Sequence, residues 1–291
     1  MKIAVFSEYG SVNSKPVFDA FITCLQEKNE NIVLNKYDES CDVAVIWSVL
    51  WSGRMQQNKK VWDFFKKQNK PVVVLEVGGI KRNVTWKMGI NGINRDADFA
   101  NNLYDNQRWP LFDIKLTPWK QTGDTIVICG QHEASHQWQG EQPMSSWIES
   151  QIQQIRTHTD KPIIIRPHPR HNVSVNEQKF KNVNIKKPTF DNTTYDDTDF
   201  KESLKSTWAV INHSSNPALE SVFAGIPVFV SASSLCYDVG GHDISNILKP
   251  AMPERIEWAN KLAYTEWTVD EIRQGTPWIR IRERLLEKYI K

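Results

Sequence analysis

IIIRPHPRH (residues 163–171) and WAVINHSSNPALESVFAGIPVFV (residues 208–230) are the two stretches that decide the fold. Each begins with an apolar run of the kind that forms a buried strand. In the second stretch the run leads into a small polar turn, then Pro217, an apolar segment that ends near Gly225, and a final apolar run. Because Pro favours the first turn of a helix and Gly the position after its last turn, this order predicts strand, helix and strand. The polar residues therefore follow the carboxyl ends of strands, where open α/β sheets bind ligands.

The residue types at these strand ends suit a phosphate group, because arginine and histidine donate hydrogen bonds or carry positive charge. The turn before Pro217 is expected to place hydroxyls and unpaired backbone N–H groups at a helix N-terminus, where the helix dipole favours an anion. Glu220, one turn into that helix, could accept a hydrogen bond from a ribose hydroxyl. Phosphate and ribose together indicate a nucleotide. The candidate residues for binding it, including those after a predicted strand at residues 125–129, are Gly130, Gln131, Arg166, His168, Arg170, His213, Ser214, Ser215, Asn216 and Glu220.

Purely structural roles compete with these assignments. His168, between two prolines, could simply end a strand, and His213 could only satisfy a turn. Ser214 and Ser215 could serve as a helix N-cap, a role that is compatible with phosphate binding. Gly130 could form an ordinary tight turn.

The ordered set RPHP and SSN-x-x-x-E-x-x-x-x-G-x-P resembles the donor-binding half of GT-B glycosyltransferases, especially bacterial sialyl- and Kdo-type transferases. Residues 262–278, LAYTEWTVDEIRQGTPW, are similar to the tail of glycosyltransferases encoded by tailed phages. The resemblance covers roughly residues 125–278. It implies an α/β protein with two Rossmann-like, doubly wound domains facing a cleft. It also implies phosphate ligands at Arg166, His168, Ser214 and Ser215 and a ribose ligand at Glu220.

The composition predicts a soluble globular protein. The chain has 291 residues, of which 40% are hydrophobic and 24% charged, and its net charge of +2 is too small to indicate a nucleic-acid partner by itself. The four cysteines are widely scattered, so neither a zinc site nor a disulfide framework is indicated. Because there is no apolar run of about 18 residues and no signal-peptide pattern, we expect a cytoplasmic monomer or homodimer without a membrane partner.

The N-terminal part alternates predicted strands and helices, which indicates a doubly wound parallel sheet. Pro118 and Gly123 flank polar residues and predict a domain boundary between them. We therefore expect an acceptor-side domain at residues 1–120 and a nucleotide-sugar domain at residues 121–275. The resemblance adds a final helix, residues 276–291, that packs back on the first domain.

Two carboxylates at strand ends of the first domain are candidates for the general base that a sugar transfer needs. Glu76 is the first choice because it follows the apolar run at residues 71–75 and precedes Gly78 and Gly79. Glu8, after the first predicted strand, is the second. Either could instead cap a helix or form a salt bridge.

Between residues 81 and 120 the regular pattern gives way to interleaved Trp, Asn, Arg and Lys. Such a long irregular segment is more often functional than idle. Aromatic and basic residues together suit a surface that stacks bases and neutralises phosphates. The alternative is a solvated loop tied down by buried tryptophans. The candidate acceptor-binding residues are Lys15, Trp51, Arg82, Trp86 and Arg95.

The implied reaction is transfer of a sugar from a nucleotide sugar, with a UDP-sugar as the expected co-substrate and no further cofactor. Arginine, histidine and backbone donors can stabilise the departing phosphate, so we expect a metal-independent enzyme. The acidic run at residues 191–199 matches no calcium-loop spacing and is expected to be a solvated loop. The expected acceptor is a 5-hydroxymethylpyrimidine in phage DNA. A capsule-type polysaccharide transferase and a non-catalytic nucleotide-sugar or nucleic-acid binding module are the alternatives.

Overall fold

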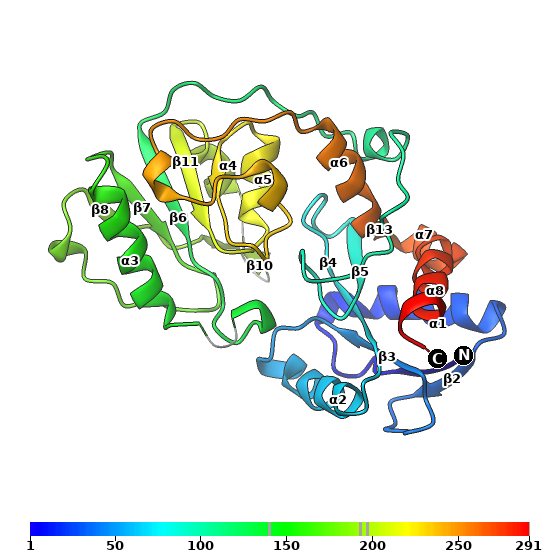
Figure 1. Cartoon of the computed structure of the whole chain (residues 1–291). Helices are drawn as coiled ribbons and strands as arrows, with labels where there is room; N and C mark the ends of the chain where they lie inside the picture. Colours follow the sequence, from blue (N-terminus) through cyan, green and yellow to red (C-terminus); the bar gives the residue numbers. More distant parts are fainter. Residues whose placement is uncertain (139–140, 192–193, 196–197, 291) are drawn as a thin grey trace. The chain divides into compact units, whose positions relative to one another are not determined.

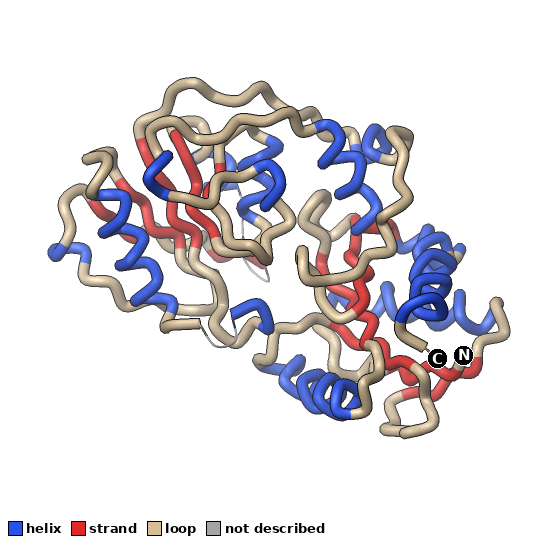
Figure 2. Tube along the Cα trace, viewed as in Figure 1, coloured by secondary structure: helices blue, strands red, loops and turns tan. Residues whose placement is uncertain are grey.

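The computed structural model describes residues 1–138, 141–191, 194–195 and 198–290, and part of the acidic run at 191–199 lies outside them. The chain forms two compact units (Figures 1 and 2). Unit 1 comprises residues 1–112 and 259–291, and unit 2 comprises residues 113–258. The first boundary lies a few residues before the expected one. The second differs more, because residues 259–275 belong to unit 1 and not to the donor domain in which we expected them.

Unit 1 is built on a six-stranded sheet in the order β13-β5-β4-β3-β1-β2. Strands β1 to β4 are parallel, whereas β5 is antiparallel to both of its neighbours. The strands are β1 (Lys2–Val5), β2 (Asn31–Leu34), β3 (Val43–Trp47), β4 (Val72–Val77), β5 (Thr85–Ile90) and β13 (Glu266–Thr268). The longer helices are α1 (Lys15–Glu27), α2 (Gln56–Lys67), α7 (Val269–Gln274) and α8 (Thr276–Lys288), and α6 (Ile256–Leu262) spans the change from unit 2 to unit 1.

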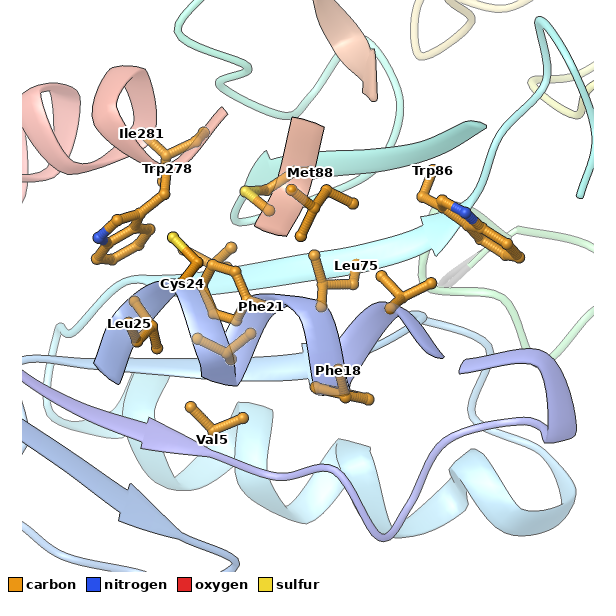
Figure 3. Close-up of a cluster of buried hydrophobic side chains, with 14 of the residues drawn as sticks. Val5, Phe18, Phe21, Cys24, Leu25, Leu75, Trp86, Met88, Trp278 and Ile281 are labelled. Carbon is orange, nitrogen blue, oxygen red and sulfur yellow. The ribbon is translucent and has the colours of Figure 1, made fainter. Parts of the chain in front are cut away.

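Helices cover both faces of this sheet, and alternate strand residues serve the two faces. Val5 belongs to the cluster formed with α1 and α8, whereas Phe6 belongs to the cluster formed with α2. In the first cluster the rings of Phe21 and Trp278 meet edge to face at 5.4 Å (Figure 3). Trp278 is fully buried, and truncating such a side chain typically costs about 3–5 kcal/mol. Helix α8 is therefore part of the core of unit 1.

Arg108 fastens residues 259–291 to the rest of unit 1. Its guanidinium donates to the carbonyl oxygens of Ala263 (2.7 Å) and Glu266 (2.6 Å) and forms an ion pair with Glu271. It also stacks over the Trp267 ring at 3.9 Å. We call this set of contacts the Arg108 clamp.

Unit 2 holds a five-stranded parallel sheet in the order β12-β11-β6-β7-β8. Helix α3 covers one face through the buried side chains of Ile148, Ile152 and Ile155. The strands are β6 (Thr125–Cys129), β7 (Ile163–Arg166), β8 (Val183–Ile185), β11 (Thr207–Asn212) and β12 (Val228–Phe229), with a separate two-stranded ribbon, β9 (Phe190–Asp191) and β10 (Thr194–Tyr195). The helices are α3 (Met144–Arg156), α4 (Thr198–Ser203) and α5 (Pro217–Phe223).

Residues 81–120 were predicted to form an irregular segment. This prediction is wrong for residues 85–90, because they form β5. All six residues of this strand are buried, including Lys87, so the sequence lacks the uninterrupted apolar run that is typical of a buried strand. Strand β13 was not expected either, because three residues are too few to show a period.

Candidate functional site

The site lies at the carboxyl edge of the unit 2 sheet, where the loops after β6, β7 and β11 begin. Strand β6 is flanked by β7 on one side and β11 on the other. The chain therefore winds outward from β6 in both directions, which makes the β6–β11 boundary the topological switch point where such sheets bind ligands. Gly130 starts the first loop, and its N–H donates to the carbonyl oxygen of Arg166 across the edge (2.8 Å). A Cβ on Gly130 would meet atoms no closer than 3.4 Å, so packing does not require glycine there.

Gln131, His213 and Ser214 form a buried network across the switch point. The Ser214 hydroxyl donates to Oε1 of Gln131 (3.0 Å) and lies 3.1 Å from Nδ1 of His213. The His213 ring packs edge to face on Trp138 at 4.8 Å, and its Nε2 lies 4.0 Å from a carboxylate oxygen of Glu141. Burial lowers the pKa of His213, although the Glu141 charge opposes this. Burial among these loops therefore favours the neutral form of the His213 imidazole.

Asn212 shapes the turn that leads into α5. Its Oδ1 accepts from the Ser215 N–H (2.9 Å), and its Nδ2 donates to the Ser215 hydroxyl oxygen (2.8 Å). The N–H groups of Ala218, Leu219 and Glu220 donate to carbonyl oxygens of the same turn. The expectation of unpaired N–H groups is thus wrong for these positions. Because its oxygen accepts from Asn212, Ser215 is left to donate its hydroxyl proton elsewhere.

Asn216 is the N-cap residue of α5 in αR conformation, and no side-chain cap hydrogen bond forms there. The N-cap role that Ser214 and Ser215 could have played is therefore not filled by a side-chain bond. Their hydroxyls are engaged with Gln131 and Asn212 instead.

Arg166 and Glu220 both lie near the Cys129 thiol. Burial raises the pKa of Cys129 to about 12, while the positive charge of Arg166 lowers it and the negative charge of Glu220 raises it. The Arg166 guanidinium also packs over the Phe200 ring at 5.2 Å. The charges of the predicted phosphate ligand and of the predicted ribose ligand thus both act on the Cys129 thiol.

Three histidines gather where β6 and β7 end. The His132 ring centroid lies 5.3 Å from that of His168 and 5.1 Å from that of His171. His171 Nε2 lies 3.4 Å from a carboxylate oxygen of Glu133. Arg170, a predicted donor ligand, is exposed beside them. Neither His132 nor His171 was among the predicted ligands, although both follow strands whose ends were expected to meet there.

The two base candidates lie in unit 1. Glu76, in β4, is half-buried, and its Oε1 accepts from the Val77 N–H at 2.8 Å. It is the register partner of the buried Lys87 in β5. Glu8 is exposed, and its own N–H donates to Asn35 Oδ1 at 3.3 Å. Glu76 therefore has the more defined environment of the two.

Two of the five predicted acceptor-binding residues are part of the core. Trp86 is 4% exposed and its ring lies 5.7 Å from that of Trp47, while Trp51 is 9% exposed and packs against Trp62 at 5.9 Å. These rings offer no face for a base to stack on, so this part of the prediction is corrected. Lys15, Arg82 and Arg95 are exposed, and Lys15 pairs with Asp19 one helical turn away.

Among the described residues, no group of three or more His, Cys, Asp or Glu side chains is arranged to hold a metal ion. Over the same residues, no helix combines the length and the apolar character that crossing a bilayer requires.

The arrangement of the chain resembles that of two solved structures from Thermosulfurimonas dismutans. One is the KpsC beta Kdo 2,7 transferase, with a TM-score of 0.53 and 14% identity over 98% of this chain and 100% of that one. The other is the KpsC beta Kdo 2,4 transferase, with a TM-score of 0.54 and 11% identity over 95% of this chain and 98% of that one. At this identity the likeness shows the fold, and it confirms the expected α/β class with two Rossmann-like units of GT-B type. No protein-family model matches the sequence, and a search of curated proteins found no match.

Proposed function

We propose that this protein is a glycosyltransferase that takes its sugar from a nucleotide sugar bound at the carboxyl edge of the unit 2 sheet. The observation that carries the proposal is the Gln131–Ser214–His213 network at the β6–β11 boundary, with Arg166 and His168 at the end of the neighbouring strand β7. The fold shared with two transferases whose names state Kdo transfer supports the same reaction class.

In this proposal the bond between the anomeric carbon and the donor phosphate oxygen breaks, and its electron pair leaves with the phosphate. Arg166 and the imidazole N–H groups would stabilise the negative charge that develops there, and Ser215 can donate its proton to the same group. These donors are held in place before the reaction, so they need little reorganisation as charge develops. We propose on this ground that transfer requires no metal ion.

The acceptor hydroxyl supplies the new bond to the anomeric carbon, and its proton must pass to a base. We propose Glu76 for this role, because Val77 occupies only one of its carboxylate oxygens with a backbone hydrogen bond. A Glu76→Gln variant should bind nucleotide as the wild type does and lose transfer by roughly two to four orders of magnitude.

Two acceptor classes remain to be separated. The resemblance of residues 262–278 to phage enzymes favours 5-hydroxymethylpyrimidine DNA, and the exposed Arg82 and Arg95 are compatible with it. A glycan acceptor is favoured by the Kdo transfer for which the two similar structures are named and by the burial of Trp51 and Trp86, which removes the expected stacking surface. Binding of duplex DNA should weaken steeply with salt, because neutralised phosphates release counterions, whereas binding of a neutral glycan should not.

The decisive experiment offers the protein a panel of nucleoside mono- and diphosphate sugars together with either hydroxymethylated DNA or oligosaccharides. Products are identified by mass spectrometry, with and without a chelator. The double variant Arg166→Ala/His168→Ala should lose transfer while remaining folded, and His158→Asn, an exposed imidazole elsewhere in unit 2, is the matched control. Wild-type turnover by the double variant would rule out this donor site, and loss of activity on chelation with recovery on adding Mg²⁺ would rule out metal independence.

A further inference from the structure

The histidine cluster at the ends of β6 and β7 has a defined hydrogen-bond arrangement that the sequence did not disclose. Nδ1 of His132 accepts from the Ala134 N–H at 3.1 Å, and Nδ1 of His168 accepts from the Arg170 N–H at 3.1 Å. Each imidazole is thus tied to the backbone two residues further on. The same local bond therefore orients both rings.

This bonding selects one protonation form. A ring nitrogen that accepts a backbone N–H carries no proton, so a neutral imidazole in this position must carry its proton on Nε2. Adding a second proton would place it on Nδ1 and break the bond to the backbone. Both His132 and His168 are therefore preset as neutral Nε2–H donors.

The charges around His132 act in the same direction. Burial lowers the pKa of His132, and electrostatic interactions with His171 and Arg170 lower it further, against the opposing charge of Glu133. Glu133 is itself engaged, because its carboxylate accepts from the Met144 N–H at the start of α3 (2.5 Å) and faces His171 at 3.4 Å. The cluster combines N–H donors and the nearby Arg170 guanidinium with the Glu133 carboxylate, whose Oε1 is already engaged, a setting that suits an anion.

We propose that His132 is a phosphoryl ligand that donates a neutral Nε2–H to the same anionic group that His168 binds. In this proposal His171, whose Nε2 faces Glu133 and whose ring packs near that of His132, positions His132. The proposal rests on the proposed nucleotide-sugar function and adds a residue that the RPHP motif does not contain. Because the donors are neutral and already oriented, binding takes up no proton at His132.

The test is calorimetric titration of the full chain with pyrophosphate and with UDP, probes that need no knowledge of the sugar. In His132→Asn the side-chain oxygen can still accept from the Ala134 N–H, so the local turn is retained. We expect roughly ten- to hundredfold weaker binding, the range for losing one hydrogen bond to a charged group. His158→Asn is the control that should bind as the wild type does, and thermal unfolding of His132→Asn should match the wild type. His132→Gln provides a second variant should His132→Asn unfold.

The protonation form is read separately. Nitrogen-15 NMR of the histidine rings should show His132 as the Nε2–H tautomer before and after pyrophosphate is added. Titrations in buffers with different ionisation enthalpies should give the same proton uptake for the wild type and for His132→Asn. An uptake that disappears in the variant would overturn the neutral-donor assignment.

The outcomes separate this inference from the proposed function. Undiminished binding by folded His132→Asn or His132→Gln would overturn the role of His132 and leave a donor site built on Arg166 and His168. Binding that depends on His132 without transfer to any acceptor would retain the phosphoryl site and reject the glycosyltransferase. Failure of the wild type to bind either probe would overturn both.

Discussion

The Arg108 clamp allows a stability prediction to be worked from individual contacts. The Arg108→Ala substitution removes a side chain that is only 9% exposed and leaves Glu271, 24% exposed, without its cation. It also leaves the carbonyl oxygens of Ala263 and Glu266 without the hydrogen bonds that Arg108 donates and exposes the face of the Trp267 ring. Breaking one side of a buried ion pair costs about 3–5 kcal/mol, mostly because the remaining charge stays buried.

We therefore expect Arg108→Ala to lower the free energy of unfolding of unit 1 by about 3–5 kcal/mol, which is a large part of the stability of an ordinary domain. Arg108→Lys should recover only part of this, because a lysine ammonium cannot donate along the separate directions that the guanidinium serves. The double variant Arg108→Ala/Glu271→Ala should be less destabilised than the two single losses summed, since no uncompensated carboxylate remains.

Urea unfolding of the full chain gives the free-energy change, and hydrogen exchange read by mass spectrometry assigns it to unit 1 or unit 2. Lys59→Ala is the matched control, because it breaks the exposed ion pair of Lys59 with Asp63 in the same unit, which should cost no more than about 0.5 kcal/mol. A loss for Arg108→Ala as small as that of the control, or a loss confined to unit 2, would refute the reasoning.

Three further predictions follow from the described contacts. Burial raises the pKa of Glu271, but hydrogen bonds from Arg108 and Thr268 outweigh it and leave the pKa lowered, so the stability gained from the pair with Arg108 is present above the ordinary glutamate range and should fade as the pH drops below it. Acid unfolding of the wild type and Arg108→Ala would show this as converging stability curves. Gly225→Ala should destabilise unit 2 by more than Gly53→Ala destabilises unit 1. Both glycines have positive φ (75° and 56°), but only at Gly225 would a Cβ lie 2.2 Å from a backbone oxygen. Equal melting temperatures of the two variants would contradict this. Burial raises the pKa of Cys129 to about 12, so this thiol should resist iodoacetamide at pH 8 in the native protein and react after denaturation, and rapid native labelling at this position would be inconsistent with the structure.

Apolar runs made much of the fold predictable. Residues 163–165 and 208–211 lie in strands of a parallel sheet and are buried except for the half-buried Ile164, so the sequence shows them as uninterrupted hydrophobic segments. Strand β5 lacks this signal because Lys87 sits inside it, and its burial depends on partners from two other strands. Strand β13 is recognisable only through its pairing with β5, a contact across most of the chain. Long-range pairing is what local patterns cannot encode.

The arrangement at the candidate site was predictable to the same degree. Strand-end positions predicted that Arg166, His168 and Ser214 lie at one edge of the sheet, because topology alone brings the ends of neighbouring parallel strands together. The pairing of Ser214 with Gln131 and the edge-to-face contact of His132 with His168 depend on loop conformations, which the order of residues does not specify. Trp51 and Trp86 were predicted to bind the acceptor but are buried. An aromatic residue in a polar segment gives no sign of whether it faces solvent or the core.

The position of β13 has a consequence for the order in which the chain can fold during synthesis. Its residues leave the ribosome only after all of unit 2 has been made, so until then β5 is an open edge strand and the α1 face of the sheet lacks α8. Unit 2 is continuous in the sequence and can close its own sheet in the meantime. Unit 1 therefore cannot complete its folding until residues 259–291 have been synthesised. Until then it has an unpaired strand edge of the kind that promotes aggregation. The N-terminal half of this protein should accordingly be the later of the two to reach its native state, the reverse of the usual order of translation.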